Sequence, residues 1–210
     1  MTEPVVLIPV KSAWVKSRLA PILSESQRRE FALLLLADVL GAFRTAGLLG
    51  RCRVVSSDAN ALNVAARLGV SGIREKKDRG VNAAVRFGIR NSGDPDKVLV
   101  VPSDLPLLRG SDITDLLTLR RAGMDVVLAP SQSFDGTNAL LFSSSSLLPL
   151  SYDSNSFWNH LKGAARLGLS TAVSSERSLM FDVDSPTDFK ELARSRSRGG
   201  AARFARRVLG

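Results

Sequence analysis

Short apolar runs alternate with helical patterns along almost the whole chain, and this alternation constrains the fold more than any other feature. The first run, Val5–Val10, is apolar throughout, which is typical of a parallel strand buried on both faces. Further strands are predicted at Arg53–Ser56, Lys97–Val101, Asp125–Ala129, Asn138–Phe142, Ser170–Val173 and Leu179–Val183. Strands that alternate with helices in this way predict an α/β doubly wound sheet.

The helical segments have recognisable ends. Ser24 and Gln27 form a capping-box pattern, and apolar residues at helical spacing follow as far as Ala42. Other helices are predicted from Asp58 to Leu68, over Val81–Ile89, from Ser111 to Arg121, around Phe157–Leu167, and after Ser185, where Pro186 takes the first helical position. Because the connections are too short to split the chain, we expect residues 1–190 to form a single domain.

The positive charge is concentrated near the C-terminus. The 210 residues carry a formal net charge of +9, and the segment from Lys190 onward contributes +6 of it. Residues 191–210 are therefore interpreted as a basic tail, in which Ala201, Phe204 and Val208 have helical spacing. We expect this tail to dock on its own subunit or on a partner, or to stay mobile.

The net charge raises the alternative of a nucleic-acid-binding protein. The rest of the chain is nearly neutral, and its sequence contains no RNA-binding motif, so we expect nucleic acid not to be a partner. With 44% hydrophobic and 23% charged residues, the chain is also not of the disordered class.

The scarcity of cysteine and histidine restricts the metal chemistry. One Cys (Cys52) and one His (His160) exclude a disulfide scaffold and a multi-cysteine zinc or iron–sulfur site. Carboxylates and substrate phosphates would then hold any metal, which favours Mg²⁺ or Mn²⁺. The apolar run Phe31–Val39 is far shorter than the roughly 20 residues that span a bilayer. Because the N-terminus enters a strand at once, without a signal peptide, we expect a cytoplasmic protein.

In doubly wound sheets the ligand lies beyond the carboxyl ends of the strands, which directs attention to the loop after the first strand. Lys11, Lys16 and Arg18 place three cations within eight residues there, as suits the phosphates of a nucleotide. The loop lacks the P-loop glycines, so ordinary kinase or ATPase chemistry does not fit. A solvated basic loop is the alternative interpretation.

Acidic residues follow two later strands. Asp104 comes directly after the run ending at Val101 and is flanked by Pro102 and Pro106, so it could hold Mg²⁺ or cap the following turn. Asp182 and Asp184 are two residues apart in a predicted strand and would share one face. Their carboxylates would repel each other unless a cation lies between them. Alternatively, Asp184 caps the next helix while Asp182 faces solvent.

Two weaker signals remain. Gly80 and Asn82 stand at a helix entrance, where backbone N–H groups can bind an anion or a base edge. The turn Phe134–Asn138 could present a hydroxyl and amides to a small anion, although turn chemistry alone would also explain it.

Read together, these motifs resemble one family. The segments that carry the resemblance are Ile8–Lys11, Lys16–Leu19, Leu23–Ser24, Gly80–Ala84, Val101–Leu108, Gly136–Leu141, Asn155–Phe157 with His160, and Asp182–Pro186. This series resembles the 2-phospho-L-lactate guanylyltransferases of coenzyme F-420 biosynthesis, over about residues 5–190. The resemblance implies a three-layer αβα fold with a mixed sheet, the GT-A-like fold of nucleotide-diphospho-sugar transferases.

The family reaction joins GTP and 2-phospho-L-lactate, or phosphoenolpyruvate in bacterial relatives, to give a diphosphate-linked guanosine and pyrophosphate. The resemblance implies that Asp104 with Asp182, Asp184 or both holds Mg²⁺ (or Mn²⁺), while Lys11, Lys16 and Arg18 act on the triphosphate. Nucleotide binding is expected at Pro9, Lys11, Ser57, Asp58, Gly80, Asn82, Pro102 and Ser103, and acceptor binding at Thr137, Asp153 and Ser156. A homodimer is expected for a small enzyme of this kind.

This sequence departs from the family pattern at two places on the acceptor side. Asp153 stands where relatives tend to have glycine, and Asp135 replaces the first glycine of a Gly-Gly-Thr segment. His160 is not expected to be a base, because a phosphate monoester is already a nucleophile; a packed or hydrogen-bonded role is predicted. Trp14, Trp158 and Cys52 are interpreted as packing or inert residues.

Other nucleotidyltransferases are the nearest alternative. Molybdenum-cofactor guanylyltransferases and cytidylyltransferases usually carry a Gly-Gly-x-Ser/Ala-x-Arg loop after the first strand, whereas this chain has Lys11, Ser12, Ala13 and Trp14 there.

Overall fold

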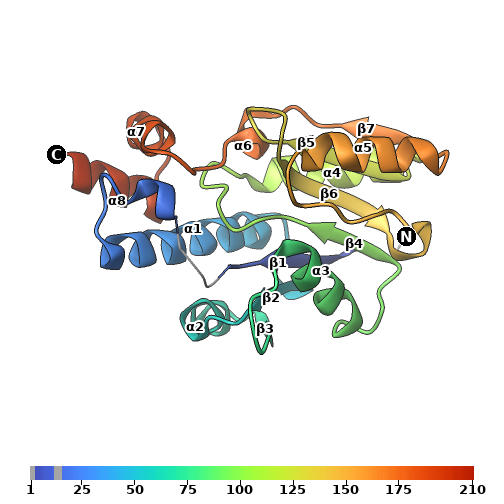
Figure 1. Cartoon of the computed structure of the whole chain (residues 1–210), viewed down its shortest axis with the longest axis horizontal. Coiled ribbons are helices and arrows are strands. Elements are labelled where there is room, and N and C mark those ends of the chain that lie inside the picture. Colours follow the sequence, from blue (N-terminus) through green and yellow to red (C-terminus); the bar gives the residue numbers. More distant parts are fainter. Residues whose placement is uncertain (1–2, 12–15) are drawn as a thin grey trace.

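The computed structural model describes residues 3–11 and 16–210, and within them one seven-stranded sheet organises the molecule (Figure 1). Its strands are β1 (Val5–Pro9), β2 (Cys52–Ser56), β3 (Ser71–Arg74), β4 (Lys97–Val100), β5 (Val126–Pro130), β6 (Thr137–Ser143) and β7 (Thr171–Val173). They lie in the order β3-β2-β1-β4-β6-β5-β7, and β6 runs antiparallel to both of its neighbours while the other pairs are parallel. The mixed doubly wound sheet is therefore confirmed.

Helices cover both faces of this sheet. They are α1 (Glu25–Thr45), α2 (Ala59–Arg67), α3 (Val81–Arg90), α4 (Gly110–Arg121), α5 (Ser156–Arg166), α6 (Arg177–Met180), α7 (Pro186–Arg194) and α8 (Gly200–Leu209), with short 3₁₀ turns at Ser17–Leu19, Leu49–Arg51 and Ser144–Ser146. Successive side chains of β1 point to opposite faces, so Val6 and Ile8 pack with α1, α2 and α4, whereas Val5 and Leu7 pack with α3 and α5. The result is the three-layer αβα arrangement.

Two local predictions are wrong, and one strand is absent from the sequence prediction. The strand β3 was missed because its four residues are largely exposed at the sheet edge and form no apolar run. The strand predicted at Leu179–Val183 is instead the end of α6 followed by an irregular segment that belongs to none of the seven strands. Ser111 does not cap α4: that helix begins at Gly110, and the backbone N–H of Arg109 donates to Asp112 Oδ2 at 2.8 Å.

The basic C-terminal segment is helical and docks on its own subunit. Residue 190 lies inside α7, so the boundary expected there does not separate two structural units. In α8, Ala201, Phe204 and other apolar residues are buried against α1 and α7 in a third hydrophobic cluster. Asp38 of α1 caps α8, because its two carboxylate oxygens accept from the backbone N–H groups of Gly200 (2.7 Å) and Ala201 (2.9 Å).

Some of the basic side chains of this segment have internal partners. Arg206 donates to the carbonyls of Ser195 and Ser197 between α7 and α8, and Arg207 pairs with Glu30 of α1 at 2.8 Å. None of the helices within residues 3–11 and 16–210 has the length and hydropathy needed to span a membrane.

Candidate active site

A cleft of about 880 Å³ opens at the edge of the sheet where β1 and β4 end and β6 begins. The chain leaves β1 toward β2 on one side and returns to β4 on the other, so the cleft lies at the switch point of the sheet. Of the residues singled out from the sequence, it is lined by Pro9, Lys11, Lys16, Arg18, Pro102, Ser103, Asp104, Thr137, Asp153, Ser156, Asp182 and Asp184.

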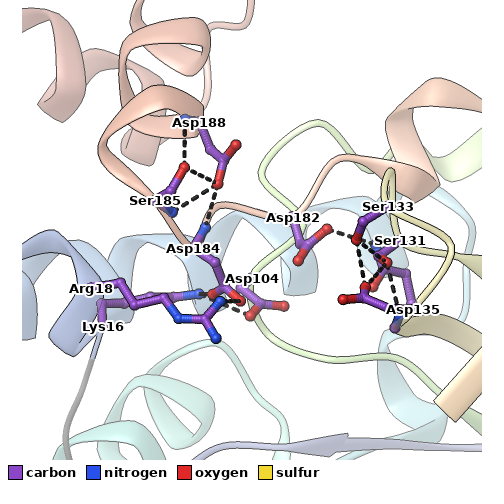
Figure 2. Close-up of polar contacts among 12 residues, drawn as sticks. Lys16, Arg18, Asp104, Ser131, Ser133, Asp135, Asp182, Asp184, Ser185 and Asp188 are labelled. Atoms are coloured by element: carbon purple, nitrogen blue, oxygen red, sulfur yellow. Dashed lines mark hydrogen bonds and ion pairs between the residues drawn. The ribbon is translucent and has the colours of Figure 1, made fainter. Parts of the chain in front are cut away.

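Ion pairs dominate one side of the cleft (Figure 2). Lys16 Nζ lies 2.9 Å from Asp104 Oδ2 and 2.7 Å from Asp184 Oδ1, and Arg18 Nη1 lies 4.0 Å from Asp184 Oδ2. Asp182 adjoins this group, and we call these five residues the charged wall. Asp104 and Asp184 were predicted to hold a metal ion, but in the structure the Lys16 ammonium lies between these two carboxylates.

The Lys16 side chain is only 12% exposed, and its charge is stabilised by its two partners. Burial alone would lower the pKa of Lys16, but Asp104 and Asp184 outweigh burial and raise that pKa above its usual range. For Asp184 burial works toward a higher pKa, yet Lys16 and Arg18 bring the pKa below its ordinary value. Both members of this ion pair are therefore charged at neutral pH.

Asp182 is the carboxylate without a close cation. Burial raises the pKa of Asp182 to about 6, and the negative charge of Asp104 adds to the effect. Asn138 Nδ2 partly offsets this by donating to Asp182 Oδ1 at 3.3 Å, and the same nitrogen donates to the carbonyls of Leu179 and Met180. Asn138 thus holds the irregular segment in place, a role that sequence reasoning missed.

The capping alternative for Asp184 does not describe the structure. Ser185 is the N-cap of α7: its side chain accepts from Asp188 N, while Asp188 Oδ2 accepts from the backbone N–H of Ser185 and Asp184. The Asp184 carboxylate is left free to pair with Lys16.

The residue types of the charged wall are suitable for binding a divalent cation, but their present arrangement is less suitable. Its three carboxylates offer the oxygen ligands that Mg²⁺ prefers. Within the described part of the chain, however, no group of three or more His, Cys, Asp or Glu side chains is arranged to hold a metal. Burial and the negative charge of Asp104 raise the pKa of the Asp182 carboxyl in this arrangement. A cation bound to Asp104 and Asp184 would take the place of the Lys16 ammonium.

Hydroxyl groups line another part of the cleft. Ser156 Oγ lies 3.0 Å from Thr137 Oγ1, and Thr137 Oγ1 lies 3.0 Å from His160 Nδ1. Thr137 and Ser156 line the cleft, whereas His160 is completely buried behind them. This confirms that His160 is a packed, hydrogen-bonded residue. We call Thr137 and Ser156, together with Ser131, Ser133 and Asp135, the hydroxyl wall.

The Asp135 part of this wall is preorganised by local hydrogen bonds. The Asp135 carboxylate accepts from the hydroxyls of Ser131 and Ser133, which lower its pKa below the ordinary value (Figure 2). The backbone N–H of Gly136 donates to Ser131 Oγ at 2.9 Å, and a Cβ at Gly136 would lie only 3.0 Å from that oxygen. Sequence reasoning identified this turn but missed Ser131 and Ser133, whose spacing with Asp135 was the available signal.

Asp153 is tied to the helix entrance predicted to bind the nucleoside. Asn82 Nδ2 donates to Asp153 Oδ2 at 3.1 Å, and Asn82 Oδ1 accepts from the backbone N–H of Tyr152 at 2.8 Å. Gly80 caps α3 with a φ of 83°, a conformation that favours glycine. Both Gly80 and Asn82 are absent from the lining of the large cleft, although Val81 between them belongs to it.

Ser57 and Asp58 lie in a second cavity of about 330 Å³, which shares Val10 and Lys11 with the large cleft. Asp58 also caps α2, as predicted, because its Oδ1 accepts from Asn60 N at 2.8 Å. Six of the eight expected nucleotide residues therefore line one or both of two adjoining cavities, and Gly80 and Asn82 line neither.

Three further predictions concern Cys52, Trp158 and Trp14. Burial raises the pKa of Cys52 to about 12, so its thiol is inert as predicted. Trp158 contacts Phe157 edge to face but remains 45% exposed, so it packs only in part. Trp14 lies outside the described residues.

Comparison with known proteins identifies relatives over nearly the whole chain. Residues 4–208 match a family model described as "Guanylyl transferase CofC like". A phosphoenolpyruvate guanylyltransferase from Rubrobacter xylanophilus is 37% identical over 205 residues, which cover 96% of this chain and 98% of that protein. A 2-phospho-L-lactate guanylyltransferase from Methanothermobacter thermautotrophicus is 34% identical, with coverages of 89% and 82%. A 3-phospho-D-glycerate guanylyltransferase from Phenylobacterium zucineum is 33% identical, with coverages of 85% and 84%.

The fold is also known from solved structures. A crystal structure from Desulfovibrio desulfuricans, assigned to the nucleotide-diphospho-sugar transferases, superposes with a TM-score of 0.77 over 99% of this chain and 95% of its own, at 18% identity. At that identity the likeness establishes the three-layer fold alone.

Proposed function

The chain belongs to the CofC-like guanylyl transferase family, and we propose that it transfers GMP from GTP to a small phosphorylated carboxylic acid, with release of pyrophosphate. Within this proposal the product serves coenzyme F-420 biosynthesis, and the acceptor is 2-phospho-L-lactate or phosphoenolpyruvate. The observation that carries it is that the charged wall and the hydroxyl wall line the same cleft.

Lys11, Lys16 and Arg18 are the groups that would bind the triphosphate. All three line the cleft, and Lys16 and Arg18 face it from the same short segment. Cations so placed stabilise the charge that moves onto the leaving pyrophosphate. Lys16 can serve in this way once its ammonium is released from Asp104 and Asp184.

The acceptor phosphate would attack the α-phosphorus of GTP directly. A phosphate monoester has a second pKa near 6, so it is already a dianion at pH 7 and needs no general base. His160 fits this absence of a base, because burial lowers its pKa to about 4 and its ring nitrogens are already bonded. The main task of the protein is then to hold the acceptor phosphate and the triphosphate of GTP in the orientation needed for this attack.

Asp104, Asp182 and Asp184 are the residues that would hold Mg²⁺ or Mn²⁺ in this proposal. When bound, such an ion offsets negative charge on the phosphates that must approach each other. The three carboxylates line the cleft at the switch point of the sheet, where Lys16 and Thr137 also line it.

The acceptor would bind at the hydroxyl wall. Thr137 and Ser156 offer hydroxyl groups, and their neighbour Gly136 lies on the same stretch of the lining. Asp153 adds a carboxylate where relatives tend to have glycine, but Asn82 holds one of its oxygens toward α3. The relatives named above act on three different acceptors, so the acceptor has to be identified by assay.

Pyrophosphate release tests the proposal directly. The protein is incubated with Mg²⁺, one nucleoside triphosphate at a time, and 2-phospho-L-lactate or phosphoenolpyruvate. We expect release with GTP and an acceptor, and loss of release when EDTA removes the metal. Absence of release with GTP and either acceptor would contradict the proposal. The homodimer expected from the sequence is part of the proposal, and sedimentation analysis would test it.

A further inference from the structure

His160, the single histidine of the chain, is fully buried, and both of its ring nitrogens form hydrogen bonds. Its Nε2 lies 3.0 Å from the backbone nitrogen of Ser151, and its Nδ1 lies 3.0 Å from Thr137 Oγ1. A backbone N–H can only donate, so Nε2 must be the acceptor and carries no proton. In the neutral ring the proton is then on Nδ1, which donates to Thr137.

The Thr137 hydroxyl receives a second hydrogen bond. Ser156 Oγ donates to Thr137 Oγ1 at 3.0 Å, whereas its other acceptor, the carbonyl of Asp135, is farther away at 3.4 Å. A hydroxyl oxygen has two lone pairs and one proton. With both lone pairs occupied by His160 and Ser156, the only hydrogen-bonding capacity left to Thr137 is its own proton.

Thr137 lines the cleft, so this remaining proton is the one that a ligand meets. Resting on the proposed function, we propose that His160 is a positioning residue that makes the Thr137 hydroxyl a dedicated donor to an anionic oxygen of the acceptor. The backbone N–H of Ser151 fixes the tautomer of His160, and this tautomer fixes the direction of the Thr137 hydroxyl proton. A proton held in that direction selects a carboxylate or phosphate oxygen of the ligand over a hydrogen-bond donor.

Burial of His160 supports this arrangement, since it lowers the pKa of the ring to about 4 and keeps it neutral under ordinary conditions. Tyr152 packs edge to face on the ring with 4.8 Å between centroids, which limits its rotation. The chain from Ser151 to Ser156 therefore surrounds the ring and holds it between the backbone and the hydroxyl wall.

The tautomer can be measured without any enzymatic activity. A two-bond ¹H–¹⁵N correlation spectrum of the uniformly labelled, tag-free protein at pH 7 will show a single imidazole, because the chain has one histidine. We expect the neutral form protonated at Nδ1. A ring protonated at Nε2, or at both nitrogens, would overturn the proposal. This measurement stands even if the protein transfers GMP to no acceptor, so the two proposals fail separately.

Kinetics then tests the link from His160 to the acceptor. The variant His160→Leu removes the donor to Thr137 and should raise the KM for the acceptor at least about tenfold, as for loss of a hydrogen bond to a charged group, with the KM for GTP unchanged. The variant His160→Asn keeps an amide donor near the position of Nδ1 and should recover part of the effect. Equal changes in both KM values would indicate a merely structural role and refute the proposal.

A double-mutant cycle with Thr137→Val isolates the coupling. If His160 acts through the Thr137 hydroxyl, His160→Leu should change the acceptor KM less than about twofold once that hydroxyl is gone. Full additivity of the two changes would refute the proposed path. Thermal unfolding of each variant shows whether the variant is folded. If a variant does not fold, the tautomer of His160 in the unmodified protein still tests the proposal.

Discussion

The two walls of the cleft are built in opposite ways. The charged wall joins residues that are distant in the sequence: Lys16 and its partner Asp184 are 168 positions apart. The hydroxyl wall and its partner His160 lie within Ser131–His160, and mostly neutral hydrogen bonds join residues that are 2 to 23 positions apart. Ion pairs can exchange partners when phosphates or a cation arrive, whereas the neutral network leaves its groups fewer alternatives. The side chains of the charged wall can therefore rearrange when a ligand binds, whereas the hydroxyl wall is a binding surface that is already formed.

The strongest test of this difference is to remove one carboxylate of the charged wall. We expect Asp104→Asn to lower turnover by about 10³-fold or more, because a proposed metal ligand and the partner of Lys16 are lost together. Pyrophosphate release measures the effect. The matched control is Asp96→Asn, which changes an exposed aspartate just before the opposite end of β4 and should leave turnover unchanged. Full activity of Asp104→Asn would remove Asp104 from the site.

The second prediction concerns the effect of the Asp182 charge on the stability of the protein without metal. Because the pKa of Asp182 is raised from 3.8 to about 6 in the folded state, its ionisation favours the unfolded chain as pH rises through this window. Asp182→Asn should therefore increase thermal stability at pH 7 without metal, by about 2–4 °C for each kcal/mol gained. The gain should shrink toward zero as pH falls to about 4. A constant gain across this range would contradict the assigned pKa.

The smallest effect is expected beside the hydroxyl wall. Asp153→Asn keeps the size of the side chain and its contact with Asn82 but removes one negative charge near the acceptor. At low salt the KM of an anionic acceptor should fall about twofold to fivefold, and the difference should diminish in 0.5 M salt through screening. Steady-state kinetics at two ionic strengths provides the measurement, with the KM of GTP as the internal control. A higher acceptor KM would show that the Asp153 charge helps binding.

Much of the fold could be predicted because buried strands and capped helices leave local signals. The apolar run of β1, the capping box at Ser24 and the cap at Asp58 each depend on residues a few positions apart. The strand β3 has no such signal, since its residues are stabilised by pairing with β2 rather than by burial. At Leu179, Phe181 and Val183, the alternation of buried residues imitates a strand, but the Asn138 amide binds the local carbonyls instead.

Many residues that line the cleft could be predicted from the sequence, but their geometry could not. The rule that ligands bind at strand ends placed Lys11 and Asp104 in the cleft, and the family resemblance added Thr137 and Ser156. No sequence pattern shows that Lys16 bridges Asp104 and Asp184, because that contact depends on the packing of three separate segments. The same holds for His160, whose importance depends on which atoms lie on either side of its ring.

The third hydrophobic cluster has a consequence for the synthesis of the protein. It joins Leu19, Phe31 and Leu35 from the beginning of the chain to Phe181, Phe189 and Phe204 near its end. A growing polypeptide therefore acquires β1, the hydroxyl wall and most of the sheet before the residues that close this cluster have been made. Until the ribosome has added Asp184, Lys16 lacks this partner, and until Phe204 has been added, α1 lacks part of its apolar cover. The charged wall and this cluster are therefore completed only after the residues of the hydroxyl wall have been synthesised.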